Sequence, residues 1–196
     1  FVEDEKVFAI VGHFGTPVVG ATLENLKEYG IPAVYFATGI GQLYADGAKT
    51  NADGYNIFPV QPLNMTEGRS LIIRAFANAV TADGTTLTGG LGAKKVGVIS
   101  NQDEASQGIL GGIKLEAESL PASKKDNIVY QEVPGTDFSA AATAIVSAGC
   151  DTVIVTVTGE ASFVAALTAL AQANFQGNVL TSYNNSDAGV LNGDNN

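Results

Sequence analysis

The stretch AIVGHFGTPVVGATLENLKEYGIPAVYFATG, residues 9–39, decides the fold. The apolar run Val7–Val11, which overlaps the start of this stretch, is typical of a parallel strand buried on both faces. A helix is predicted over Pro17–Tyr29, with Thr16 as its N-cap, proline at its first position and glycine after its end. Pro32–Phe36 has the composition of a second strand. Strand, helix and strand in this order indicate a βαβ unit with parallel strands.

The same alternation continues along the chain. Further strands are predicted over Asn56–Val60, Lys95–Ser100, Asn127–Val133, Asp151–Thr156 and Asn178–Thr181. Helices are predicted over Thr66–Ala82, Asp103–Leu120, Ala140–Ala148 and Phe163–Ala173. Strands separated by helical segments of roughly 10–15 residues form βαβ units. The predicted fold class is therefore α/β with doubly wound parallel sheets.

A boundary between two parts of the chain is predicted near residues 58–65, where FPVQPLNM carries two prolines. Because proline lacks an N–H and fixes φ, a central strand or helix is disfavoured there, and a linker between two α/β layers is expected. A single continuous sheet is the alternative. The chain starts just before a strand and ends in a polar stretch, so we expect a piece of a longer protein. In that case, apolar surface in residues 1–60 should be exposed or covered from outside.

The composition argues against several classes of protein. The chain has 20 acidic and 10 basic residues, a formal net charge of −10, which argues against a nucleic-acid partner. No apolar run approaches the roughly 20 residues of a membrane span. Cys150 is the only cysteine, so it cannot form an internal disulfide. Its apolar neighbours predict a core residue rather than a reactive thiol.

No catalytic or metal-binding motif is recognisable. His13 is the only histidine, and a packed role is favoured over that of a base. The sequence lacks the nucleophile motif G-x-S-x-G and the phosphate-binding loop G-x-x-x-x-G-K-[ST]. One histidine and one cysteine do not make a metal site. We therefore predict that the chain is not an enzyme and holds neither metal nor cofactor. An α/β enzyme whose catalytic groups lie on other segments is a weaker alternative.

Small and hydroxylic residues follow the predicted strands. In open parallel sheets, ligands bind outside the carboxyl ends of the strands, and glycine loops before helices leave N–H groups for a carboxylate or another polar group. The loops are Gly12–Thr16, Ala37–Gly39, Ser100–Gln102, Val157–Gly159 and Ser182–Asn184. For any single loop, ordinary turn and cap residues are the simpler interpretation. The recurrence of the pattern after successive strands favours a binding site.

Several stretches resemble the branched-chain amino-acid (Leu/Ile/Val-binding) type of periplasmic substrate-binding protein, the receptor subunit of ABC importers. They include FVEDEKVFAIVGHFGT, LIIRAFANAV, KKVGVISNQDEASQG and VPGTDFSAAATAIVSAGCDTVIV, in the order found in that family. The resemblance implies two doubly wound lobes that close over a ligand in the cleft between them. It places residues 1–60 in an incomplete lobe one and residues 61–183 in lobe two. Residues 184–196 would form a polar tail that leads to the return crossover.

The resemblance also implies ligand contacts in both lobes. In lobe one, Gly15 and Thr16 correspond to residues that bind a ligand carboxylate, and Ala37, Thr38 and Gly39 to the loop that binds its ammonium group. In lobe two the match is weaker: Ala105 stands where the family has an aromatic residue, and the acidic residue that the family often has falls near Tyr183, with Asn184 beside it. The lobe-two contacts implied are Asn101, Ala105, Thr158, Gly159, Tyr183 and Asn184. Because a buried ammonium without a carboxylate is costly, the mapping favours a carboxylate-bearing ligand more than an amino acid as such.

The function implied by the resemblance is that of an extracytoplasmic solute receptor for an ABC importer. It would work in the periplasm or as a cell-surface lipoprotein, and its precursor would carry a signal peptide. Its partners would be a small molecule, such as an amino acid or another small carboxylate, and a membrane permease, with no nucleic acid. A ligand-sensing regulatory domain of the same fold is the alternative.

Overall fold

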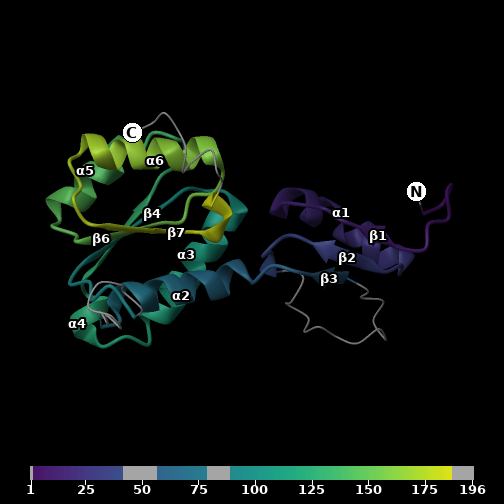
Figure 1. Ribbon diagram of the computed structural model, residues 1–196, viewed down its shortest axis with the longest axis horizontal. Helices are drawn as coiled ribbons and strands as arrows, with labels where there is room; N and C mark the ends of the chain where they lie inside the picture. The colour runs from purple at the N-terminus through teal and green to yellow at the C-terminus, as the bar shows by residue number, and fades with distance from the viewer. Residues whose placement is uncertain (1, 42–56, 79–88, 187–196) are drawn as a thin grey trace. The chain divides into compact units, whose positions relative to one another are not determined.

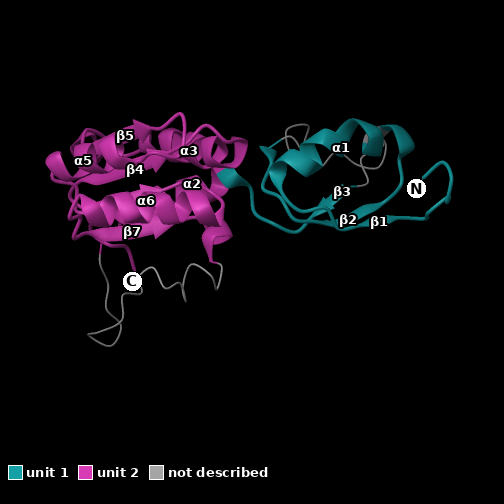
Figure 2. Ribbon diagram, turned by 90° about the horizontal axis from the view of Figure 1, so that it is seen from above, with its two compact units in different colours: residues 1–64 teal, residues 65–196 magenta. Residues whose placement is uncertain are grey.

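The computed structural model describes residues 2–41, 57–78 and 89–186. The chain divides into two compact units, unit 1 with residues 1–64 and unit 2 with residues 65–196 (Figure 2). Each unit contains its own sheet of parallel strands. The predicted α/β class with parallel sheets is confirmed, and the described strands do not form a single continuous sheet. The glycine-rich segments predicted as loops, 37–54 and 82–93, lie largely outside the described residues.

Unit 1 is built on a three-stranded sheet in the order β1-β2-β3. β1 is Ile10–Val11, β2 is Ala33–Phe36 and β3 is Ile57–Pro59, and α1, Thr16–Tyr29, connects β1 to β2 (Figure 1). α1 ends at Gly30, which adopts the left-handed conformation with φ 63°. Glycine reaches this conformation without steric cost, so it ends the helix where the sequence predicts.

β1 is shorter than the predicted strand Val7–Val11. Its pairing starts with the bond from Ile10 N to Pro32 O, at 2.8 Å, and β2 begins at the next residue. Because α1 ends only just before Pro32, β2 has no residues that could lie opposite residues 7–9. Apolar composition alone therefore overestimated the strand, since pairing depends on the length of the partner.

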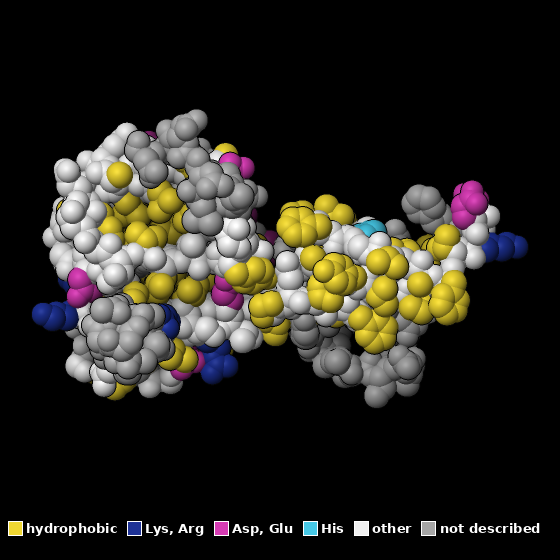
Figure 3. All heavy atoms as spheres, viewed as in Figure 1, with side chains coloured by type: hydrophobic (Ala, Val, Ile, Leu, Met, Phe, Trp, Pro, Cys, Tyr) yellow, Lys and Arg dark blue, Asp and Glu magenta, His cyan; other side chains and the backbone are white. Residues whose placement is uncertain are grey.

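α1 covers one face of the unit 1 sheet. The core on that face consists of Val19, Leu23, Leu26, Ala33, Phe36 and Ile40, with Ile10 and Ile57 packed against it. Val11, Val34 and Phe58 are in register one position further along, and their side chains alternate to the opposite face. Val11 is 73% and Phe58 54% exposed there. Figure 3 shows hydrophobic side chains gathered over unit 1 on the side in view, so the expected exposure of apolar surface in residues 1–60 is observed.

Unit 2 is built on a four-stranded sheet in the order β5-β4-β6-β7. Its strands are β4 (Val96–Ser100), β5 (Ile128–Glu132), β6 (Thr152–Val155) and β7 (Asn178–Thr181). Its helices are α2 (Asn64–Phe76), α3 (Glu104–Ala117), α4 (Ala122–Lys125), α5 (Ser139–Ser147) and α6 (Glu160–Gln172), followed by the short 3₁₀ helix η3 (Tyr183–Asn185). α2 begins at the last residue of unit 1.

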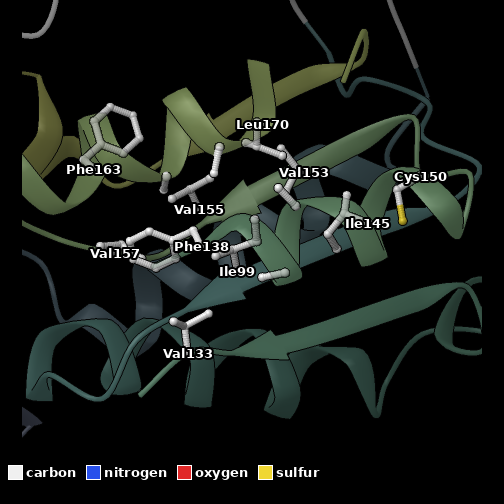
Figure 4. Close-up of a cluster of buried hydrophobic side chains, with 14 residues drawn as sticks. Ile99, Val133, Phe138, Ile145, Cys150, Val153, Val155, Val157, Phe163 and Leu170 are labelled. Atoms are coloured by element: carbon white, nitrogen blue, oxygen red, sulfur yellow. The ribbon is translucent and has the colours of Figure 1, made fainter. Parts of the chain in front are cut away.

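Helices cover both faces of the unit 2 sheet. On one face, strand residues such as Val153 and Val155 pack against Phe138 before α5 and Phe163 of α6 (Figure 4). Cys150 belongs to this cluster and is 9% exposed, which confirms its prediction as a core residue. Burial raises the pKa of its thiol.

On the other face of the unit 2 sheet, the strand residues are Val96, Val98 and Ile154, packed against α2 and α3. These two helices approach each other closely. A Cβ atom at Gly112 of α3 would overlap the carbonyl oxygen of Met65 in α2, whereas one at Gly111 would meet no atom within 4 Å. Gly112 is therefore required by helix packing.

The main differences from the predicted helices are two boundaries and one additional short helix. α2 ends at Phe76 rather than near residue 82, because the backbone N–H groups of Leu91 and Ala93 bind carbonyls of its last turn. α6 starts at Glu160 rather than Phe163, after Gly159, which caps the helix with φ 90°. The short helix α4 was not predicted. Each difference arises from backbone contacts that hydrophobic periodicity does not report.

Candidate functional site

The loops that follow β1 and β2 lie side by side in unit 1. Gly15 N donates to Ala37 O at 3.1 Å, and Ala37 N donates to His13 O at 3.0 Å. A bridge between Phe14 and Ala37 continues the parallel pairing of the two strands into these loops. The structure thereby brings together the five lobe-one residues predicted to contact a ligand, namely Gly15, Thr16, Ala37, Thr38 and Gly39.

Thr16 and Thr38 form a buried pair of hydroxyls. Their Oγ1 atoms are 3.0 Å apart, and the two residues are 6% and 2% exposed. Ile40 N also donates to Thr38 Oγ1, at 3.3 Å. The hydroxyl pair holds two protons and uses one in its own bond, so one O–H can serve an acceptor such as a carboxylate oxygen.

Thr16 is not the N-cap of α1, contrary to the prediction. Gly15 occupies the N-cap position with φ 91°, and Thr16 is the first residue of the helix. A residue with a Cβ is strained at that φ, whereas glycine is not. No side chain caps α1, so the hydroxyl of Thr16 is left to Thr38.

The loop after β2 approaches its neighbours closely through backbone atoms. Ala37 O accepts from Gly15 N, and Gly39 O accepts from Asn64 N at 3.0 Å. A carbonyl oxygen has two lone pairs, so each can take a second donor. A Cβ at Gly39 would overlap the side chain of Asn64 and come within 2.6 Å of Pro62 O. Glycine is therefore required at residue 39 of the predicted ligand loop.

His13 packs against Phe36, with ring centroids 4.9 Å apart and the planes inclined by 12°. This contact fits the packed role favoured from the sequence. His13 also lines a cavity of about 300 Å³ between α1 and residues 2–4. Tyr29 at that cavity donates to Glu3 Oε1 at 2.8 Å, and this bond is the main cause that raises the pKa of Tyr29. None of the predicted ligand residues lines the cavity.

In unit 2, the predicted residues after β4 and β6 lie where the helices that follow these two neighbouring strands pack on opposite faces of the sheet. β4 lies between β5 and β6. The helix after β4, α3, packs on one face of the sheet, and the helix after β6, α6, packs on the other. Open α/β sheets bind ligands at such a switch point, outside the carboxyl ends of the strands. The residues placed there are Asn101, Ala105, Thr158 and Gly159.

Asp103 ties these two loops together. Its Oδ1 accepts from Ser106 N at 2.8 Å, as the N-cap of α3, and from Thr158 Oγ1 at 3.3 Å. Beneath it, Ser106 Oγ lies 3.2 Å from Ser100 Oγ and 2.8 Å from Thr156 Oγ1. Asp103 was predicted as a solvated position at the start of its helix, and no role was predicted for Ser106. A local signal for Asp103 exists, because aspartate is a preferred N-cap residue at the start of a helix.

Tyr183 and Asn184 lie in η3, at the carboxyl end of β7. Tyr183 N donates to Glu67 Oε1 at 2.8 Å, and Ser182 Oγ donates to Glu67 Oε2 at 3.1 Å. Burial raises the pKa of Glu67, and these hydrogen bonds lower it in part. A carboxylate therefore lies beside Tyr183, although no acidic residue precedes or follows it directly. No local signal could have found Glu67, which is 116 positions away in the chain.

The comparison with known proteins gives a family. A family model described as "Periplasmic binding protein" matches residues 1–194. The chain belongs to this family. Its structure is similar to that of the leucine-binding protein LivK from Thermotoga maritima, with 19% identity, a TM-score of 0.69, and coverage of 99% of this chain and 50% of that one. It is also similar to an ABC-transporter solute-binding protein from R. palustris in complex with benzoate, with 19% identity, a TM-score of 0.68, and coverage of 99% and 49%.

Another R. palustris solute-binding protein, in complex with 4-hydroxybenzoate, has 16% identity, a TM-score of 0.65, and coverage of 94% of this chain and 45% of that one. No curated protein sequence matches significantly. The chain thus spans about half the length of these solved relatives. The fold is that of type I periplasmic binding proteins, and the prediction of a binding protein rather than an enzyme is confirmed by the family membership.

The predicted contact residues of this periplasmic binding protein offer hydrogen-bonding groups. Within residues 2–41, 57–78 and 89–186, no group of three or more His, Cys, Asp or Glu side chains could hold a metal ion. None of the helices in the same ranges has both the length and the hydrophobicity needed to cross a bilayer. The predicted contacts form two sets, one in each unit, composed of hydroxyl, amide and carbonyl groups.

Proposed function

We propose that the chain is part of an extracytoplasmic solute-binding receptor of an ABC importer, and that it takes a small carboxylate-bearing ligand between two lobes. The observation that carries the proposal is the buried hydroxyl pair of Thr16 and Thr38 at the carboxyl ends of β1 and β2. Because the two buried hydroxyls use only one of their protons in the bond between them, the other O–H can donate to an anionic oxygen of a ligand. Unit 1 belongs to lobe one and unit 2 to lobe two in this proposal.

The ligands named for the similar solved proteins support the same chemistry. They are leucine for the Thermotoga maritima protein and benzoate or 4-hydroxybenzoate for the R. palustris proteins. The shared feature of the three is a carboxylate. In this chain, Thr16 and the N–H groups near Gly15 would bind that carboxylate. Ala37, Thr38 and Gly39 would meet the other polar end of the ligand.

The second set of contacts would come from lobe two. Asn101, Thr158 and Gly159 offer polar atoms at the switch point, and Ala105 leaves room where a larger side chain would fill it. Tyr183 and Asn184 would add contacts from the turn after β7. A small carboxylate-bearing ligand, such as an amino acid of the Leu/Ile/Val class, is the proposed ligand. An aromatic carboxylate also fits, since no residue of the predicted set carries a negative charge for an ammonium group.

A ligand-sensing regulatory domain of the same fold is the second candidate function. It uses the same contacts with the ligand and differs in the partner, a signalling protein instead of a membrane permease. Genes for a permease and an ATPase beside the gene for this protein would support import. A kinase or DNA-binding gene there would support sensing.

The ligand proposal is tested by Thr16→Val in the full-length protein, with calorimetric titration of L-leucine and of benzoate. The substitution keeps the shape of the side chain and removes the donor. A hydrogen bond to a charged group contributes roughly 1.5–3 kcal/mol, so affinity should fall about 10- to 150-fold. Thr22→Val is the matched control, because the Thr22 hydroxyl bonds only to carbonyls of its own helix. An affinity unchanged by Thr16→Val would contradict the proposed role of Thr16.

A further inference from the structure

Glu67 joins two segments of unit 2 that are far apart in the sequence. It lies in the first turn of α2, and its carboxylate accepts one hydrogen bond from the side chain of Ser182 and one from the backbone of Tyr183. The donors come 115 and 116 positions later, directly after β7. The contact therefore fixes the turn Ser182–Asn185 to the start of α2.

No positive charge balances this carboxylate within the described part of the chain. The ion pairs found there do not include Glu67. Arg69, the next charged residue on α2, is 2.7 Å from Glu116 of α3. β7 and η3 contain no charged residue, and Asp103 at the start of α3 accepts from Ser106 and Thr158.

The ionised form of Glu67 is disfavoured by folding. Burial is the largest influence on its pKa and raises it, and the two hydrogen bonds only partly offset that effect. A half-buried carboxylate with no counter-charge is a poor choice for stability alone. Such a residue is more typical of a functional position than of a core.

The turn that Glu67 holds has a second attachment. Asn185 Nδ2 donates to Val157 O at 2.8 Å and to Thr181 Oγ1 at 2.7 Å. Asn184 N donates to Ser182 Oγ at 3.1 Å. The turn is thus held at its first residues by Glu67 and at its last by Asn185. Tyr183 and Asn184, both predicted ligand contacts, belong to this doubly attached turn.

We propose that Glu67 is a positioning residue of the binding edge of unit 2, which holds the turn Ser182–Asn185 so that the exposed Asn184, beside the partly buried Tyr183, is presented to the ligand. The positioning stands on contacts within unit 2, and only its effect on affinity rests on the proposed function. A carboxylate accepts both hydrogen bonds at once, whereas alanine accepts neither. Glutamine can accept from Tyr183 N and donate to Ser182 Oγ, so it preserves the turn without the charge.

The positioning is tested first without a ligand, by amide hydrogen exchange at Tyr183 in the 196-residue chain. Glu67→Ala should raise the exchange rate at Tyr183 by roughly tenfold, since it removes a hydrogen bond to a charged acceptor. Glu67→Gln should keep the rate close to that of the wild type. Glu104→Gln is the matched control, because Glu104 also lies in the first turn of a helix but is exposed.

The pH profile separates positioning by the carboxylate from a merely structural role. In the wild type, protection of the Tyr183 amide should rise as the pH drops through the raised pKa of Glu67, because the folded protein favours the protonated form of this half-buried carboxyl group. Glu67→Gln should show no such step. Should Glu67→Ala fail to fold, Ser182→Ala removes one of the two donors and should also raise exchange at Tyr183. An exchange rate at Tyr183 that is the same in the wild type, in Glu67→Ala and in Ser182→Ala would overturn the inference.

The second arm measures affinity of the full-length protein for L-leucine and benzoate. Glu67→Ala should weaken binding of whichever probe the wild type binds by roughly tenfold, because the loosened turn must be ordered again in the complex. Glu67→Gln and Glu104→Gln should bind as the wild type does. Faster exchange with unchanged affinity would overturn the ligand role of the turn. A wild type that binds no carboxylate would instead refute the proposed function, while the exchange arm still decides the positioning.

Discussion

Units 1 and 2 are both built from parallel strands joined by helices, but they cover their sheets differently. In unit 2, helices pack on both faces, and every residue of β4 and β6 is buried. In unit 1, α1 covers one face, while Val11 and Phe58 on the other face are largely exposed. Parallel sheets are normally covered on both faces. The comparison teaches that unit 2 encloses its own core, whereas the unit 1 sheet leaves apolar side chains exposed on one of its faces.

The largest expected effect is a difference in stability between one phenylalanine-to-alanine substitution in each unit. Phe138→Ala in unit 2 removes a side chain that is 1% exposed, and it should cost about 3–5 kcal/mol of unfolding free energy. Phe58→Ala on the open face of unit 1 should change stability by only about ±0.5 kcal/mol. Urea unfolding, followed by amide exchange in β4 and in β2, measures the two units separately. A cost at Phe58 as large as that at Phe138 would show that the open face is covered, and the contrast would fail.

A smaller effect concerns how closely helices approach within each unit. Gly112→Ala in unit 2 forces α2 and α3 apart and should destabilise it by about 1–3 kcal/mol. Gly20→Ala in α1 of unit 1 brings its Cβ to 3.5 Å from Ile40 Cδ1, an ordinary contact, and should stabilise the helix by about 0.5–1 kcal/mol. Thermal unfolding of both variants checks the signs. Gly111→Ala, with open space around it, is the control within α3, and a loss of stability there would point to helix propensity rather than packing.

The smallest expected effects concern the pH dependence of stability, which should differ between the two units: the step in unit 2 lies at acidic pH and the step in unit 1 at alkaline pH. The pKa of Glu67 in unit 2 is raised chiefly by burial, so its stabilising contribution is full below the pKa of an unfolded glutamate and is lost as the pH rises through the folded value. The stability of Glu67→Gln relative to the wild type should therefore increase between acidic and neutral pH. The pKa of Tyr29 in unit 1 is raised chiefly by its bond to Glu3, so its contribution is lost only in alkali. Tyr29→Phe should remove the alkaline step and leave the acidic one, as measured by urea midpoints across pH. A single step common to both variants would contradict the assignment to separate units.

The alternation of strands and helices could be predicted from the sequence because it depends on patterns of residues that are close together in the chain. Hydrophobic periodicity, Pro17 at the start of α1 and Gly30 at its end act over a few residues, and the structure has these elements within a few positions of the predicted ones. Cys150 was predicted as a core residue for the same reason, since its neighbours along the chain are apolar. The five lobe-one residues were predicted as ligand contacts from the family resemblance, and the structure brings the two loops that carry them together.

What the sequence determined by itself is therefore the class of fold, the position of most elements and the loops at the carboxyl ends of the strands. Only the tertiary structure decided that Thr16 bonds to Thr38 instead of capping α1, that β1 pairs over only two residues, and that the strand order is β5-β4-β6-β7. It also decided that Glu67 meets Tyr183 across 116 positions. The physical reason is range: propensity and capping are set by neighbours along the chain, whereas a hydrogen bond between distant residues forms only where packing has already brought their backbones together.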